Sequence, residues 1–110
     1  MDDDALVRES VCETLSDLGV EVHEASDGVE GLEVLEHHPE IAMVVTDIAM
    51  PRLDGISFAR RARALHPKLK VLFMTGQQAK PASETVLSKP FRHSALVAAV
   101  RALLAGPKAA

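Results

Sequence analysis

The sequence predicts an α/β domain in which a parallel sheet lies between layers of helices. Helical and strand-like hydrophobic spacing alternate along the 110 residues, and this alternation is typical of strand–helix units that form parallel sheets. Two strand candidates, 41–46 and 71–74, are almost continuously apolar, which indicates strands covered on both faces. The length allows one domain with a single core, which we place at residues 1–105, followed by a short tail at 106–110.

The first predicted helix covers residues 6–18, where apolar side chains recur at helical spacing. Asp3 or Asp4 precedes it as an N-cap, and Gly19 follows it as the left-handed residue that ends many helices. The next segment, 20–25, alternates apolar and polar side chains, which predicts a short strand.

The middle of the chain repeats this order of elements. A second helix is expected at 29–35 and ends before Pro39, and the apolar strand at 41–46 follows. Helical spacing returns at 56–65, which predicts a third helix ahead of the apolar strand at 71–74.

The last part of the chain predicts a short strand and a final amphipathic helix. Val86 and Leu87 indicate the strand, and the helix is expected at 96–104. The interval 76–88 leaves room for only about two helical turns once that strand is subtracted. Because Pro81 also interrupts this interval, we expect the fourth helix there to be shortened.

Composition excludes several classes of function. The 12 basic and 16 acidic residues give a net charge of −4, which argues against a nucleic-acid-binding surface. A single cysteine, Cys12, excludes an intrachain disulfide and favours a reducing compartment. No apolar run is long enough to span a bilayer, and acidic residues follow Met1 where a signal peptide has basic ones. We therefore expect a soluble, cytoplasmic domain that acts on neither nucleic acid nor membrane.

Polar residues stand where the predicted strands end. Asp47, Thr75 and Lys89 each follow a strand candidate, and Asp2 and Asp3 precede the first helix, where a further strand end would normally lie. In open parallel sheets the functional groups gather at the carboxyl ends of the strands. We therefore expect these five side chains to converge on one edge of the sheet.

This set of groups is suited to phosphoryl transfer. Three carboxylates with too few cations repel one another, and a divalent ion such as Mg²⁺ is the simplest way to neutralise them. A carboxylate beside that ion can carry a phosphoryl group, because the metal and an ammonium offset the charge while a hydroxyl bonds one oxygen. An aspartyl phosphate is a known type of covalent intermediate.

Four segments resemble the receiver domain of bacterial response regulators in two-component systems. They are Asp-Asp at 2–3, Asp-Ile-Ala-Met-Pro-Arg-Leu-Asp-Gly at 47–55, Met-Thr-Gly at 74–76 and Lys-Pro-Phe at 89–91. The similarity extends over residues 2–104 with the elements in the family's order. It implies a flavodoxin-like, doubly wound parallel sheet, and the shortened form is similar to receivers attached to hybrid histidine kinases or to lone receivers.

The resemblance also implies the roles of the acidic residues. Asp47 is expected to be the phospho-acceptor. Asp2, Asp3 and Asp47 are expected to hold Mg²⁺, together with the backbone carbonyl of Ala49. Asp54, which precedes Gly55, is instead expected from its residue type to make a turn and cap the third helix rather than to contact phosphate.

The remaining implied roles concern the phosphate and the partners. Thr75 is the expected switch hydroxyl, and Lys89 is expected to pair with phosphate and to form a cis bond with Pro90. A histidine kinase or a histidine phosphotransfer domain is the implied phosphodonor, and a second copy of the chain is a further candidate partner. Beyond its own phosphorylation and dephosphorylation, the domain is not expected to be an enzyme.

The sequence departs from the family at its start, where the family has an apolar strand and only Met1 precedes the acid pair. Either the sequence is a truncated form, or another segment or chain fills this place. Without that strand, 20–25 and 41–46 lose their common neighbour, so we expect them to pair directly or to borrow a strand from a second copy. Direct pairing would move the acid pair away from Asp47.

A second departure concerns the switch residue, while the missing first strand leaves another function open. Val86 stands where many receivers have an aromatic switch residue, and the chain has no Tyr or Trp, so the usual Thr–aromatic switch is not expected. The alternative to a phospho-accepting receiver is a degenerate receiver-like interaction module that is not phosphorylated. An Asp-dependent phosphohydrolase is disfavoured, because Ala49 stands where such enzymes usually place a general acid.

Overall fold

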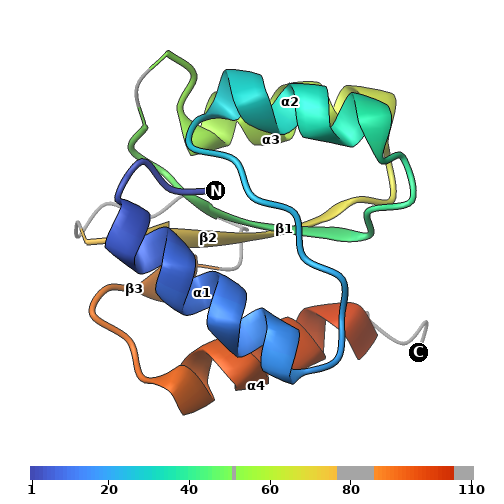
Figure 1. Ribbon diagram of the computed structural model, residues 1–110. Coiled ribbons are helices and arrows are strands. Elements are labelled where there is room, and N and C mark those ends of the chain that lie inside the picture. The colour runs from blue at the N-terminus through green and yellow to red at the C-terminus, as the bar shows by residue number, and fades with distance from the viewer. Residues whose placement is uncertain (51, 77–85, 106–110) are drawn as a thin grey trace.

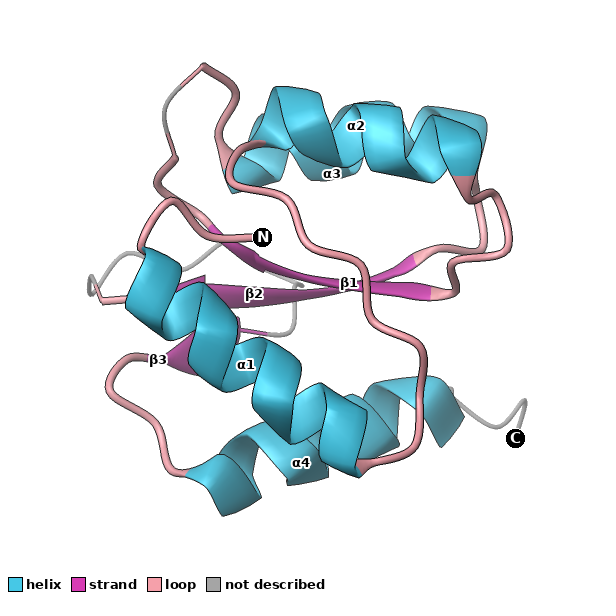
Figure 2. Ribbon diagram, in the orientation of Figure 1, coloured by secondary structure: helices cyan, strands magenta, loops and turns pink. Residues whose placement is uncertain are grey.

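The computed structural model describes residues 1–50, 52–76 and 86–105, in which three parallel strands lie between two pairs of helices. The strands follow one another across the sheet in the order β1 (Met43–Asp47), β2 (Lys70–Thr75), β3 (Val86–Ser88). One face of the sheet is covered by α2 (Gly28–His37) and α3 (Gly55–Leu65), and the other by α1 (Ala5–Asp17) and α4 (His93–Ala105) (Figures 1 and 2). The predicted α/β architecture is confirmed.

Local signals in the sequence place the ends of the helices. Asp4 caps α1 by accepting a hydrogen bond from the Leu6 amide at 3.0 Å, and Asp54 caps α3 by accepting one from the Ser57 amide at 2.7 Å. Gly19 has a φ of +80° just after α1, the left-handed conformation predicted for it. None of the helices in the described part of the chain is long and apolar enough to cross a membrane.

The core consists of two apolar clusters separated by the sheet. Strand β2 contributes to both, because Val71 and Phe73 pack under α2 and α3 while Leu72 and Met74 pack under α1 and α4. All four of these side chains are buried. A central parallel strand is apolar on both faces because helices cover both of its faces. This packing fixes the position of β2 and therefore the position of its carboxyl end.

The predicted strand at 20–25 is wrong. This segment has no regular secondary structure and crosses the face of the molecule between the end of α1 and the start of α2 (Figure 2). A strand needs a ladder of backbone hydrogen bonds with a neighbour. Among the described residues, this segment has one backbone bond to the amino-terminal segment, from the Asp2 amide to the Ala25 carbonyl at 3.4 Å.

Direct pairing between 20–25 and β1 is also wrong, because Met1 lies between them. The Met1 ammonium donates to the Val45 carbonyl, and the Met1 carbonyl accepts from the Asp47 amide at 2.9 Å. A single residue thus occupies the end of the expected first strand. Consequently the acid pair that follows Met1 stays beside Asp47 rather than moving away from it.

The last part of the chain follows the prediction where it is described. Strand β3 includes the predicted Val86 and Leu87, and α4 begins three residues before the predicted 96–104. The shortened helix predicted within 76–88 falls largely on residues 77–85, which lie outside the described residues.

Candidate functional site

The five polar residues predicted to converge lie at the carboxyl edge of the sheet. Asp47 is the last residue of β1, Thr75 is the last residue of β2, and Lys89 directly follows β3. The Lys89 amide donates to the Thr75 carbonyl at 2.7 Å, which holds these two strand ends together. The Lys89–Pro90 peptide bond is cis, as the resemblance implied. Thr75 itself is buried.

Lys89 joins two carboxylates at the centre of the site. Its Nζ donates to Asp47 Oδ2 at 3.0 Å and to Asp2 Oδ2 at 2.8 Å. The side chain of Asp2 is only 1% exposed, and those of Asp47 and Lys89 are 14% and 21% exposed. Hydrogen bonds between charged partners are stronger than neutral ones. One ammonium therefore holds two nearly buried carboxylates in fixed positions.

The same contacts keep Lys89 charged. Burial by itself lowers the pKa of an ammonium, but the hydrogen bonds and charges of Asp2 and Asp47 outweigh that effect. The pKa of Lys89 is therefore raised above its ordinary value. At neutral pH the Lys89 ammonium is therefore positively charged and lies next to the Asp47 carboxylate.

A third acidic residue completes a cluster that fits a divalent cation. Each of Asp2, Asp3 and Asp47 offers a carboxylate oxygen, and these oxygens lie within 4.8 Å of one another. Asp3 is exposed, so the cluster opens to solvent on one side. Carboxylate, carbonyl and water oxygens are the ligands that Mg²⁺ binds in proteins. Ala49 is exposed two residues after the end of β1, and its amide donates to Asp47 Oδ1 at 3.4 Å.

Arg8 holds the acidic turn in place, a role that sequence reasoning missed. One guanidinium nitrogen of Arg8 donates to the Asp2 carbonyl at 2.9 Å, and another lies 3.4 Å from a carboxylate oxygen of Glu24. The side chain thereby links α1 to the segment 20–25 across the turn that carries the acid pair. No local pattern indicates this contact, because Glu24 is distant in the sequence.

The loop after Asp47 is held by an ion pair that sequence reasoning also missed. Asp27 caps α2 by accepting from the Glu30 amide at 2.9 Å, and its Oδ2 accepts from Arg52 at 2.9 and 2.6 Å. The Glu30 amide, followed by the Arg52 guanidinium, lowers the pKa of Asp27. An Asp-Gly pair before a helix signals such a cap, but nothing local signals its partner. Arg52 adopts a φ of +66° in this loop.

Gly55 allows the same loop to pack against the backbone of Asp47. A Cβ at position 55 would lie 2.2 Å from the Asp47 carbonyl oxygen. The Gly55 amide also donates to the Ile48 carbonyl at 2.8 Å. Glycine is therefore required here by close approach rather than by its φ angle.

Comparison with known proteins identifies one family. The family model of the response regulator receiver domain matches residues 1–101. Response regulator MprA of Mycobacterium leprae (strain TN) is 38% identical over 112 residues, covering 94% of this chain and 49% of the relative. Response regulator receiver protein CpdR of Brucella abortus (strain 2308) is 35% identical over 111 residues, covering 94% of this chain and 92% of the relative. The chain thus spans about half the length of MprA.

Solved structures show the same fold. A response regulator receiver protein from Sinorhizobium medicae WSM419 superposes with a TM-score of 0.86 at 32% sequence identity, covering 96% of this chain and 90% of that one. The predicted flavodoxin-like fold and the resemblance based on four segments are both confirmed.

Proposed function

Since this chain belongs to the response regulator receiver domain family of two-component systems, we propose that it accepts a phosphoryl group on Asp47 from a phosphohistidine. The proposal is carried by the position of Asp47, the last residue of β1, whose carboxylate lies 3.0 Å from the Lys89 ammonium. In the transfer, the phosphorus–nitrogen bond of the phosphohistidine breaks and a phosphorus–oxygen bond to Asp47 forms. The histidine nitrogen then keeps the bonding electron pair.

The residues around Asp47 orient the reaction and offset its charge. Lys89 fixes one oxygen of Asp47 and provides a positive charge where the phosphoryl oxygens arrive. The hydroxyl of Thr75, at the neighbouring strand end, is the proposed donor to one phosphoryl oxygen. In-line transfer depends mainly on such positioning and charge stabilisation.

Mg²⁺ is the cofactor we propose for this site. Asp2, Asp3 and Asp47, with the backbone carbonyl of Ala49, would hold the ion, which when bound offsets the negative charge of the incoming phosphoryl group. The clustering of three carboxylates supports this assignment, since a single Lys89 leaves a net negative charge among these four side chains.

The family also suggests the partners and the location. We propose a histidine kinase or a histidine phosphotransfer domain as the donor, in the cytoplasm. The domain would catalyse no reaction other than its own phosphorylation and dephosphorylation.

Labelling with a small phosphodonor tests the acceptor. The protein is treated with acetyl phosphate and Mg²⁺, and intact-mass analysis should show one phosphoryl addition that disappears with EDTA or with Asp47→Asn. Asp54→Asn is the matched control, because Asp54 is an exposed aspartate of the same loop that only caps α3; it should be labelled like the wild type. Equal labelling of Asp47→Asn would show that the acceptor is another residue. A folded wild type that takes no label would instead favour the unphosphorylated interaction module.

A further inference from the structure

Asp2 is held at every one of its polar groups. Its carboxylate accepts a hydrogen bond from the Lys89 ammonium at 2.8 Å and another from the Asp4 amide at 2.9 Å. Its amide donates to the Ala25 carbonyl at 3.4 Å, and its carbonyl accepts from Arg8 at 2.9 Å. Arg8 therefore holds the backbone of this buried acid, whereas Lys89 holds its carboxylate.

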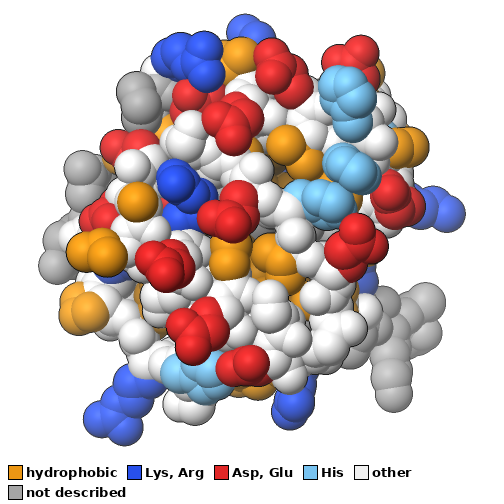
Figure 3. Space-filling view, in the orientation of Figure 1, with side chains coloured by type: hydrophobic (Ala, Val, Ile, Leu, Met, Phe, Trp, Pro, Cys, Tyr) orange, Lys and Arg blue, Asp and Glu red, His pale blue; other side chains and the backbone are white. Residues whose placement is uncertain are grey.

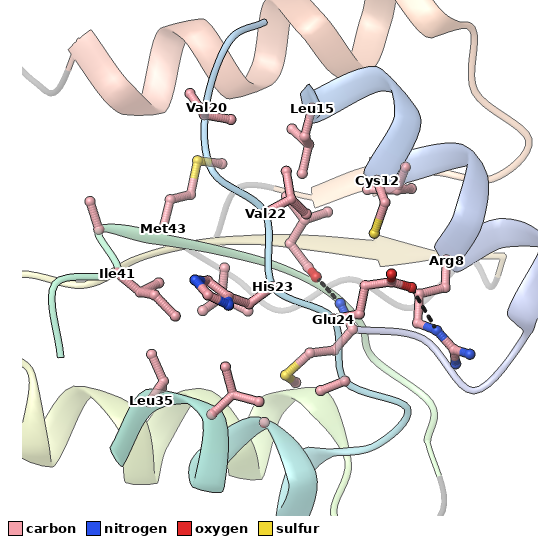
Figure 4. A pocket seen from close by; sticks show the side chains of 18 of the residues that line it. Arg8, Cys12, Leu15, Val20, Val22, His23, Glu24, Leu35, Ile41 and Met43 are labelled. Atoms are coloured by element: carbon pink, nitrogen blue, oxygen red, sulfur yellow. Dashed lines mark hydrogen bonds and ion pairs between the residues drawn. The ribbon is translucent and has the colours of Figure 1, made fainter. Parts of the chain in front are cut away.

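Arg8 is itself anchored by a second contact. Its Nη1 donates to the Asp2 carbonyl, while its Nε lies 3.4 Å from Glu24 Oε1. Figure 4 shows the Arg8 side chain extending from α1 toward Glu24, with this ion pair drawn as a dashed line. Arginine can make both contacts at once because its nitrogens are fixed in a planar fork, which the single ammonium of lysine does not provide. The guanidinium thus links the backbone of Asp2 to the segment 20–25.

The charge of Arg8 by itself opposes the binding of a cation, because like charges repel. The Glu24 carboxylate offsets part of that charge. Acidic side chains are spread over the face that α1 and the segment 20–25 form, and most basic ones lie at its rim (Figure 3). The exposed acids of these two elements are Glu9, Glu13, Asp17, Glu21 and Glu24. If charge alone decided the affinity, losing Arg8 would therefore tighten the binding of Mg²⁺.

The contact of Arg8 with the backbone has the opposite effect. Asp2 and Asp3 lie in an irregular segment, outside any helix or strand. A metal site binds its ion more tightly when the ligands are already held in place, because ordering a mobile ligand costs free energy. Groups that orient metal ligands typically contribute about 10–100-fold in metal affinity. The bond from Arg8 to the Asp2 carbonyl therefore favours metal binding.

We propose that Arg8, anchored by Glu24, is a positioning residue that raises the affinity of the acidic cluster for Mg²⁺. The inference rests on the metal site of the proposed function. Arg8 is not part of the cluster, and it acts through the backbone that carries the carboxylates of Asp2 and Asp3. Removing its guanidinium should weaken Mg²⁺ binding even though a positive charge is lost.

The test is a titration with Mg²⁺ at constant ionic strength, followed through the amide shifts of Asp3, Asp4 and Ala49 in NMR spectra. Arg8→Met keeps an unbranched side chain without donors, and its dissociation constant for Mg²⁺ should be about tenfold larger than that of the wild type. Arg8→Lys restores the charge and one donor, so its dissociation constant should be intermediate.

Matched variants separate the contact from the charge. Arg61→Met removes an equal charge from an exposed position on α3, and it should bind Mg²⁺ like the wild type because salt screens exposed charges. Glu24→Gln removes the anchor of Arg8 and should weaken binding by a smaller factor than Arg8→Met. Glu21→Gln removes an equal charge from the same segment, where Glu21 pairs with a histidine instead, and should leave binding unchanged. In the Arg8→Met background, Glu24→Gln should have little further effect, since it acts through Arg8.

The outcomes distinguish this inference from the proposed function. Urea unfolding establishes that each variant is folded under the conditions of the titration. Equal or tighter Mg²⁺ binding by Arg8→Met, or equal effects of Glu21→Gln and Glu24→Gln, would overturn the role of Arg8 while leaving the metal site intact. A wild type that does not bind Mg²⁺ would overturn the metal site and this inference together. If Arg8→Met does not fold, the two glutamate variants decide the question, because both change exposed residues of an irregular segment.

Discussion

Gly55→Ala should damage both stability and phosphorylation, because it acts on the backbone of the acceptor. The added Cβ would lie 2.2 Å from the Asp47 carbonyl oxygen and 3.1 Å from the Ile48 Cα. Both obstacles are backbone atoms, so no side-chain rotation relieves the contact. The loop or the end of β1 must move by roughly an ångström to restore an ordinary van der Waals distance.

The expected loss in the free energy of unfolding on Gly55→Ala has two parts. Overpacking at a tight site costs about 1–3 kcal/mol. Moving the loop also weakens the hydrogen bond from the Gly55 amide to the Ile48 carbonyl, now 2.8 Å long, which is worth about 1 kcal/mol. We therefore expect Gly55→Ala to lower the free energy of unfolding by about 2–4 kcal/mol. A misplacement of about 1 Å at Asp47 should also slow labelling by about a hundredfold.

Urea unfolding and the rate of labelling by acetyl phosphate measure the two effects. Gly76→Ala is the matched stability control, because a Cβ there has nothing within 4 Å; it should change the free energy of unfolding by no more than about 0.5 kcal/mol. The reasoning fails if the two variants are equally stable. It also fails if Gly55→Ala is labelled at the rate of the wild type, since Asp47 would then not depend on the loop.

Three further predictions follow from individual contacts. Lys89→Met should slow labelling of Asp47 about a hundredfold through loss of charge stabilisation, and a rate near that of the wild type would contradict the role of this ammonium. Asp4→Ala removes the cap of α1 and should cost about 1 kcal/mol in urea unfolding, yet labelling should persist, because Asp4 is outside the acidic cluster. Because the pKa of Asp27 is lowered by folding, its contribution to stability is complete above the unfolded pKa of about 3.9 and is lost as the pH falls through the folded value. The difference in melting temperature between wild type and Asp27→Asn should therefore shrink below about pH 4, and a difference that grows on acidification would contradict this sign.

Much of the fold and the site could be predicted because the signals are local. The caps at Asp4 and Asp54 and the stop at Gly19 involve neighbours within a few residues. The spacing of hydrophobic residues identifies the strands that precede Asp47 and Lys89. The carboxyl ends of parallel strands meet at one edge of the sheet. The sequence alone therefore predicted which polar side chains would come together.

The tertiary structure decided what depends on a distant partner. Segment 20–25 has the hydrophobic pattern of a strand but forms none. A strand forms only beside a neighbouring strand that shares a ladder of backbone hydrogen bonds with it, and Met1 supplies a single residue of such a neighbour. The ion pair of Asp27 with Arg52 likewise joins residues that no local pattern relates. The local spacing of hydrophobic residues indicates which face of a segment is buried. Strand pairing and ion pairs depend instead on which distant residues lie next to that segment, and only the folded chain determines those neighbours.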